Sequence, residues 1–495
     1  MEFVQELKDY YNYLKKYIYI ILGLYAVIEI GLFIKIGTSN VLMFVSSIFV
    51  TLFVLCSLIL MFKDFVTASL IYAVSIPIIP MVLYIMNRLH IAGIGEVVYL
   101  AYFAMYLTNM AREYKNGGFD FSRLNVKYTK LSILYIILIV LAAISSILSI
   151  HVLEAFKLVL LSVISMMIYS IGMLCYKKNN KEFYKGILFY LCLGVTISAI
   201  PDIVVTLYNL IVRGNNQHLY GVLGSNFMLG YTIIVMPFIL LYAINKDLSE
   251  KYNKVYKLLL LIQIINFSTQ KSRGILVTLA MCFFIVFIID IKNWKKYILL
   301  SIVIFSCMTF NVMHRWDMEE IVVELKIDNI SDIAGTNAKI ISRLINQTKN
   351  RRPIWALAFK MINDHTYFGV GPGHFKYYYL QYHGNPKKMY IDAHNIILNL
   401  ITEFGVIFTF TFMLAWLGGM VKSVLDIIKN KKKDFKEFKW PGIIGLLCLL
   451  AYGNITGQSF MTSRDPLSVV PAFVFTVVMI LMIYSEGKSS NKKLG

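Results

Sequence analysis

Apolar runs of about 15 to 25 residues recur along almost the whole chain, and short polar or basic segments separate them. An α-helix of this length crosses the hydrocarbon core of a bilayer. The pattern therefore predicts an all-α polytopic membrane protein with about 12–14 transmembrane helices. The predicted spans lie near residues 17–36, 41–62, 65–86, 91–110, 130–150, 154–176, 184–208, 219–244, 255–270, 274–292, 297–312, 396–420, 441–457 and 466–484.

Composition and charge placement agree with this prediction. Of the 495 residues, 58% are hydrophobic and 15% are charged, and the mean hydropathy is +0.67. In a soluble protein the net charge of +20 would suggest nucleic acid as a partner. Here alternating loops and the termini hold 30 of the 48 basic residues, whereas the short loops on the opposite side hold seven. The positive-inside rule then places both termini in the cytoplasm, and the basic loops attract anionic membrane lipid and not nucleic acid.

The first 16 residues, "MEFVQELKDYYNYLKK", form a charged, amphipathic stretch before the first apolar span. No small-residue cleavage site follows that span, so we expect a retained signal anchor in the cytoplasmic (inner) membrane.

The longest segment without an apolar span is residues 313–395, which we expect to form a large extracytoplasmic helical loop. A channel or carrier seldom needs such a loop, whereas an enzyme that acts at the outer face does. The predicted organisation is N-terminal transmembrane helices (1–218), transmembrane helices that include an SRG segment (219–312), the loop (313–395) and C-terminal transmembrane helices (396–495).

Four basic residues are predicted to lie on the outer side. Arg351 and Arg352 begin "RRPIWALAFKMIND", whose proline suits the first turn of a helix, where unpaired backbone N–H groups attract anions. Lys271 and Arg273 stand in "QKSRG", between two apolar runs at the outer boundary. These cations could simply be solvated or could extend to the interface, but together they could also hold a diphosphate.

The segment "IDAHNIILNLITEFG" places an ionisable histidine, two asparagines and a glutamate at the start of an otherwise apolar helix. If it is helical from residue 392, then Asp392, Asn395, Asn399 and Glu403 form one polar stripe that descends into the bilayer, with His394 at its top. Such groups are costly in a membrane unless they face a cavity or partners, so the stripe is either a functional site or a set of interhelical hydrogen bonds. Histidine can accept a proton near neutral pH, which the amides cannot do.

Together, "QKSRG", the long loop with "FGVGPGHF" and then "DAHNIILNLITEFG" resemble the O-antigen ligase and polymerase superfamily, of Wzy_C type. The ligase signature is His, then Asn, Ser or Gln, nine residues, then Gly, and His394, Asn395 and Gly405 match it. The resemblance covers about residues 220–420. The family often has a small residue or Tyr three positions beyond the glycine, where this chain has Phe408.

The resemblance implies a GT-C-like membrane glycosyltransferase that uses an undecaprenyl-diphosphate-linked glycan as donor, with its active site on the extracytoplasmic side. It assigns His394 the role of general base. Arg273 and Arg352 would hold the diphosphate leaving group, with Arg351 or Lys271 assisting.

The amides Asn395 and Asn399 and the acid Glu403 complete the site that the resemblance implies, by orienting the acceptor or the top of the helix. The first external loop, "KIGTSN", carries no acid, and no DxD pair occurs elsewhere. We therefore expect an inverting transfer with no metal and no cofactor, in which arginine takes the place of a divalent cation.

Two alternatives stay open. A flippase for lipid-linked oligosaccharides would have a similar number of spans and a basic interior, but no need for the long loop. Within the superfamily, a polymerase joins repeat units, whereas a ligase moves a finished glycan to a terminal acceptor that is a glycan, a lipid or a protein.

Overall fold

Helices are the only regular secondary structure in the part of the chain that the computed structural model describes, and one isolated bridge joins Phe119 and Tyr176. The described residues are 2–36, 41–88, 94–122, 129–159, 165–213, 225–245, 248, 250–269, 273–315, 351–383, 392–429, 436–456 and 469–484. The helices are α1 (Glu2–Lys15), α2 (Ile18–Ile36), α3 (Val41–Met61), α4 (Phe65–Arg88), α5 (Ile94–Lys115), α7 (Thr129–Ile147), α8 (Val152–Val159), α9 (Ser165–Cys175), α10 (Lys181–Arg213), α11 (Ser225–Ile244), α12 (Asn253–Thr269), α13 (Arg273–Ile289), η4 (Ile291–Asn293), α14 (Trp294–Arg315), α17 (Phe375–His383), α18 (Ile396–Lys429), α19 (Lys436–Thr456) and α20 (Val469–Tyr484). Residues 351–364 are also helical.

In the described residues each predicted apolar span coincides with one of these helices, except that 154–176 are divided between α8 and α9 and that 274–292 extend past α13 into η4. In the described residues, two helices are by themselves long and apolar enough to cross a membrane, Lys181–Asn209 of α10 and Ile396–Ile428 of α18. Two bent pairs raise that number to four: Phe3–Lys15 with Ile18–Phe33, and Gly274–Ile289 with Ile291–Cys307. Several apolar helices therefore support an integral membrane protein, and the number of spans stays a prediction.

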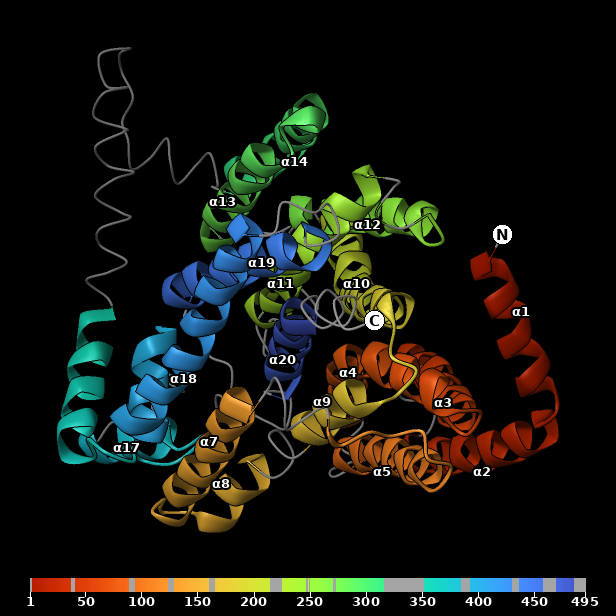
Figure 1. Ribbon diagram of the computed structural model, residues 1–495, viewed down its shortest axis with the longest axis horizontal. Coiled ribbons are helices and arrows are strands. Elements are labelled where there is room, and N and C mark those ends of the chain that lie inside the picture. Colours follow the sequence, from red (N-terminus) through yellow and green to blue (C-terminus); the bar gives the residue numbers. More distant parts are fainter. Residues whose placement is uncertain are drawn as a thin grey trace, which may run out of the picture.

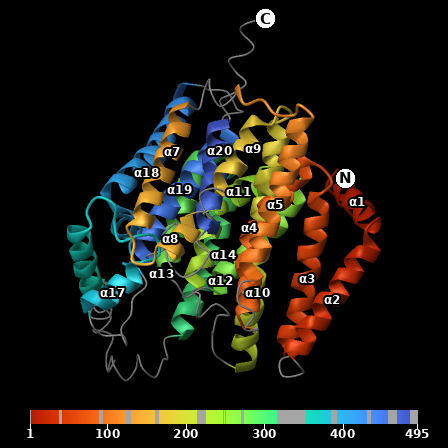
Figure 2. The same ribbon diagram turned by 90° about the horizontal axis from the view of Figure 1, so that it is seen from below.

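The long helices run side by side as a bundle (Figures 1 and 2). Two pairs approach very closely, because each has a glycine at the contact. A β-carbon on Gly194 of α10 would lie 2.3 Å from the Val74 carbonyl oxygen of α4, and one on Gly445 of α19 would lie 2.3 Å from the Ile234 carbonyl oxygen of α11. Small residues at such contacts let backbones pack directly in membrane proteins, where van der Waals contact takes over from hydrophobic burial.

At one side of the bundle, α18 packs against both α7 and α19. The end of α18 that begins at Ile396 lies near α17 and the helical residues 351–364 (lower left in Figure 2). These belong to the predicted external loop, of which residues 316–350 and 384–391 lie outside the described part of the chain.

The first helix is fixed to the bundle through one carboxylate. Glu6 of α1 lies 2.7 Å from Lys251 Nζ and accepts hydrogen bonds from the hydroxyls of Tyr190 (2.8 Å), Tyr252 (3.4 Å) and Tyr10 (3.1 Å). The Glu6 side chain is largely buried by these partners, with 15% exposed. One acid thus joins α1 to α10 and to the α11–α12 corner.

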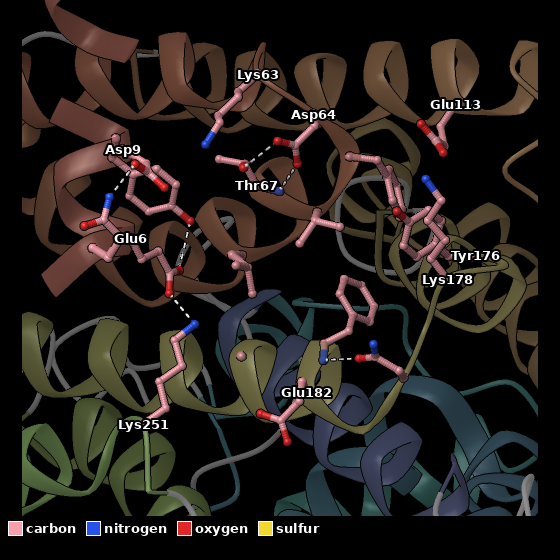
Figure 3. A pocket seen from close by; sticks show the side chains of 18 of the residues that line it. Glu6, Asp9, Lys63, Asp64, Thr67, Glu113, Tyr176, Lys178, Glu182 and Lys251 are labelled. Carbon is pink, nitrogen blue, oxygen red and sulfur yellow. Dashed lines mark hydrogen bonds and ion pairs between the residues drawn. The ribbon is translucent and has the colours of Figure 1, made fainter. Parts of the chain in front are cut away.

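Beside this contact lies a hollow of about 800 Å³, whose walls include Glu6, Lys63, Asp64, Lys178 and Lys251 (Figure 3). Most of these residues lie in segments that the charge pattern assigns to the cytoplasm, so α1 forms one wall of a polar hollow at the predicted cytoplasmic end.

We expect Glu6→Ala to detach α1 from the bundle, because the change leaves Lys251 and three tyrosine hydroxyls without a shared acceptor. Hydrogen bonds to a charged group contribute about 1–3 kcal/mol each. Limited proteolysis in detergent should cut the N-terminal segment faster, while the rest of the chain keeps its melting temperature. Asp9→Ala, which removes only a contact with Gln5, should behave as wild type. Equal cleavage rates for Glu6→Ala and wild type would contradict this role.

Candidate active site

The helix α18 is interrupted at Gly405, where φ is 82° and ψ is 172°. In an unbroken helix the Val406 N–H would donate to the Thr402 carbonyl. Here Val406 N–H donates to the Thr366 carbonyl (2.9 Å), and the Thr402 carbonyl accepts from Val370 N–H (2.8 Å). The chain just before α17 thus supplies the hydrogen bonds that the helix gives up.

Only glycine fits at this break. A β-carbon on Gly405 would lie 2.1 Å from the Tyr367 carbonyl oxygen, and its positive φ is unfavourable for other residues. The next hydrogen bond between this turn and α18 runs from Gly371 N–H to the Glu403 carbonyl (2.9 Å), and here too the backbone packs closely against a neighbour. Gly371 has φ 104°, and its β-carbon would lie 2.3 Å from Ser149 Cβ. The residues "FGVGPGHF" therefore form a turn that holds the broken helix.

The corner between α7 and α8 supports the same contact from the N-terminal half of the chain. Ser145 Oγ donates to the Glu403 carbonyl (2.8 Å). The His151 backbone N–H donates to His374 Nε2 (3.2 Å), so His374 Nδ1 carries the proton and donates to the Pro372 carbonyl (2.7 Å). His374 is thus held as a neutral imidazole in one tautomer.

Burial lowers the pKa of His374 from its ordinary value of 6.5. Nearby His151 and Lys376 lower it further, whereas the Pro372 carbonyl and Glu154 act in the opposite direction. The imidazole is buried, with 1% of the residue exposed, so protonation would remove the acceptor at Nε2 in a place with little water.

The start of α18 differs from the predicted polar stripe. The helix begins at Ile396 and not at residue 392, because Asn395 acts as the N-cap. Its Oδ1 accepts hydrogen bonds from Ile397 N–H and Leu398 N–H, both at 3.0 Å. Asparagine caps a helix in this way by satisfying donors that have no partner within the helix.

The residue before the histidine is held on both sides. Ala393 N–H donates to Asn399 Oδ1 (2.5 Å), and the Ala393 carbonyl accepts from Trp355 Nε1 (2.9 Å). Asn399 is buried, so its amide supports the backbone and is not open to solvent.

His394 has a positive φ of 51°, and no other non-glycine residue in the described part of the chain has one. The carboxylate of Asp392 accepts its backbone N–H at Oδ1 (2.8 Å), and the same oxygen lies 2.6 Å from Nδ1 of the ring. The side chain of His394 is 36% exposed and that of Asp392 is 22% exposed. The imidazole is therefore fixed in position yet accessible.

The helical residues 351–364 pack as an amphipathic helix against α17. Ile354 and Ala358 are buried in an apolar cluster with Phe375. Phe359, the residue after Ala358, lies off this buried face, with 57% exposed. The indole N–H of Trp355 binds the backbone at one edge of the face.

The structure brings some of the predicted cations to this place. Arg351 is half-buried, and burial lowers its pKa from the ordinary value, while the charge of nearby Asp392 counteracts that effect. Arg352 is exposed on the same helix, next to Arg351. Lys271 lies outside the described residues, and Arg273 begins α13 with a side chain that is not described.

Glu403 is buried just before the break in α18, with 1% of the residue exposed. Its carboxylate faces the backbone N–H groups of Gly373 and Phe375 and lies near Asp392. It therefore joins α18 to the turn before α17 and does not face solvent.

Within the described residues, no group of three His, Cys, Asp or Glu side chains is arranged to hold a metal ion. Sequence reasoning missed the contributions of Ser145, Ser149, His151 and the Trp355 indole. These residues and their partners are up to 258 positions apart in the sequence, and no local sequence pattern indicates the contacts. His151 and Trp355 are uncommon residue types in this chain, which is the only signal that could have singled them out.

Residues 258–413 match the family model Wzy_C, described as O-antigen ligase. This segment, about a third of the chain, is similar to the O-antigen ligase family. The match includes His394, Asn395 and Gly405, and it confirms the resemblance seen in the sequence. It supports a glycosyltransferase-like role in surface polysaccharide synthesis for an integral membrane protein. No curated protein matches the chain.

The break in α18 gives the glycine of the family signature a physical role that can be tested. We expect Gly405→Ala to destabilise the protein by about 1–3 kcal/mol, because the added carbon meets the Tyr367 carbonyl and the positive φ is strained. Thermal unfolding in detergent measures this loss. Gly418→Ala in the same helix, where a β-carbon meets nothing within 4 Å, is the matched control and should melt as wild type. Equal melting of both variants would contradict the role given to Gly405.

The buried His374 predicts a loss of stability in acid. Because its pKa is lower in the folded protein than in the unfolded chain, the unfolded chain binds the proton first as pH falls below 6.5. The melting temperature should therefore fall between pH 7.5 and 5.5 by more in wild type than in His374→Gln. His365→Gln, at a half-buried histidine of the same segment, is the matched control for the loss of a histidine side chain. An unchanged slope in His374→Gln would show that another group titrates.

Proposed function

We propose that the protein transfers a glycan from an undecaprenyl-diphosphate-linked donor to an acceptor hydroxyl at the outer face of the cytoplasmic membrane. Both termini would lie in the cytoplasm and the site on the other side, in a GT-C-like arrangement. The observation that carries this proposal is His394, an accessible imidazole held rigidly at the start of a broken helix in the segment that matches the O-antigen ligase family.

In the proposed reaction, His394 takes the proton of the acceptor hydroxyl as that oxygen attacks the anomeric carbon of the donor. The new bond joins the acceptor oxygen to the anomeric carbon. The bond from that carbon to the diphosphate oxygen breaks, and the lipid diphosphate leaves with the electron pair. Attack from the face opposite the leaving group inverts the configuration at the anomeric carbon.

The diphosphate gains negative charge as it leaves and needs cations nearby. We assign this task to Arg352 and Arg273, with Arg351 or Lys271 assisting, and expect no divalent metal to be required. Arg352 is supported by its exposed side chain, on the helix whose Trp355 contacts the Ala393 carbonyl beside His394.

The other predicted site residues fit a positioning role. Asn395 caps α18, Asn399 holds the backbone of Ala393, and Glu403 binds the turn before α17. Since Asn399 and Glu403 are buried, we assign them to the support of His394 and not to contact with the glycan.

Glycan transfer by purified protein tests the proposal. Wild type should turn over an undecaprenyl-diphosphate oligosaccharide in the presence of EDTA, and His394→Ala should lose about 10²–10⁴-fold in rate, the usual contribution of a general base. Arg352→Ala should also be slow, whereas Lys360→Ala, which removes an exposed cation of the same helix, should stay active. Full activity in both site variants would refute the assignment. Movement of the donor across a bilayer without its consumption would favour the flippase.

The acceptor can be identified in cells. A deletion strain that accumulates single repeat units indicates a polymerase, whereas one that accumulates long lipid-linked chains indicates a ligase.

A further inference from the structure

The turn that carries His394 is organised by one oxygen atom. Oδ1 of Asp392 accepts the His394 backbone N–H at 2.8 Å and lies 2.6 Å from Nδ1 of the His394 ring. The same atom thus constrains both the backbone, which has the uncommon φ of 51°, and the ring. Asp392 stands outside the family signature, which begins at the histidine.

The short distance between Oδ1 and Nδ1 determines which nitrogen carries the proton. A carboxylate oxygen and a bare ring nitrogen both present lone pairs and would repel each other at 2.6 Å. The contact does not meet hydrogen-bond geometry, so it acts through charge, and attraction to the carboxylate favours a proton on Nδ1. In the neutral imidazole Nε2 then carries the lone pair and is the atom that can accept a proton.

Two charged side chains from neighbouring helices lie near Asp392. Arg351 approaches it from the helical residues 351–364, and Glu403 approaches it from α18. Arg351 offsets the negative charge of the carboxylate, so the carboxylate, the imidazole and the guanidinium form a partly buried, balanced set.

The backbone of this turn does not depend on Asp392 alone. Asn399 and Trp355 hold both polar groups of Ala393, and Asn395 caps the helix that follows. Removal of the charge from residue 392 therefore leaves the turn in place.

We propose that Asp392 is a positioning residue that fixes the tautomer and orientation of His394 and so leaves Nε2 as the proton acceptor for the acceptor hydroxyl. This inference rests on the proposed function of His394 as a base.

The test uses Asp392→Asn in the full-length protein. Asparagine keeps a side-chain oxygen that can accept the His394 backbone N–H, so it retains the turn and removes only the charge that attracts a proton to Nδ1. We expect kcat for glycan transfer to fall on the order of 10²–10⁴-fold, because a histidine base in the wrong tautomer is inactive, with KM changed by less than about threefold. Asp364→Asn, at an exposed acid bonded to Tyr382, should keep the wild-type kcat. Wild-type kcat in Asp392→Asn would overturn the proposal.

A second readout needs no donor. Nitrogen-15 spectra of histidine-labelled protein in lipid distinguish the two tautomers, and the His394 signals are identified by their loss in His394→Gln. Wild type should carry the His394 proton on Nδ1, whereas Asp392→Asn should shift the population towards Nε2. If this shift occurs but no protein transfers glycan, the pairing stands and the proposed function fails. If the tautomer does not change, the pairing is refuted even in an active transferase.

Discussion

The absence of a β-carbon at Gly405 is the constraint on which the candidate site depends. With φ at 82° and the Tyr367 carbonyl pressed against it, this position stops the hydrogen bonding of α18 and exposes two carbonyl groups in the interior. Unsatisfied carbonyls in such a place would be costly. The N–H groups of Val370 and Gly371 satisfy them, so the break and the external turn each require the other.

This mutual dependence explains how a single segment can carry an accessible imidazole beside a membrane span. The polar side chains at the start of α18 hold nearby backbone in place. Asn395 caps the helix, Asn399 binds the Ala393 N–H, and Glu403 contacts the turn before α17. His394, by contrast, combines a backbone fixed by Asp392 with a partly exposed side chain. The arrangement suits preorganised chemistry, because little of the geometry has to form after a substrate binds.

The helices could be predicted from the sequence because long apolar runs have one stable form in a bilayer, with all backbone groups satisfied internally. The residue cluster at 392–405 could be predicted because its polar groups are out of place among apolar neighbours. The backbone conformation of this cluster could not be predicted. The start of α18 at Ile396 follows from a side-chain cap, and periodicity does not distinguish a cap from another polar position on the helix. The support from the α7–α8 corner joins residues more than 200 positions apart, and only the assembled bundle brings them together.

The contact between the broken helix and the external turn is made almost wholly by peptide groups. Thr366, Val370 and Gly371 bind α18 through atoms that every amino acid other than proline possesses. Apart from the glycines, the side chains of this turn can therefore be exchanged during evolution without loosening the attachment. Related enzymes could therefore differ in the side chains that this turn presents to a sugar, while the His394 imidazole keeps its position at the start of α18.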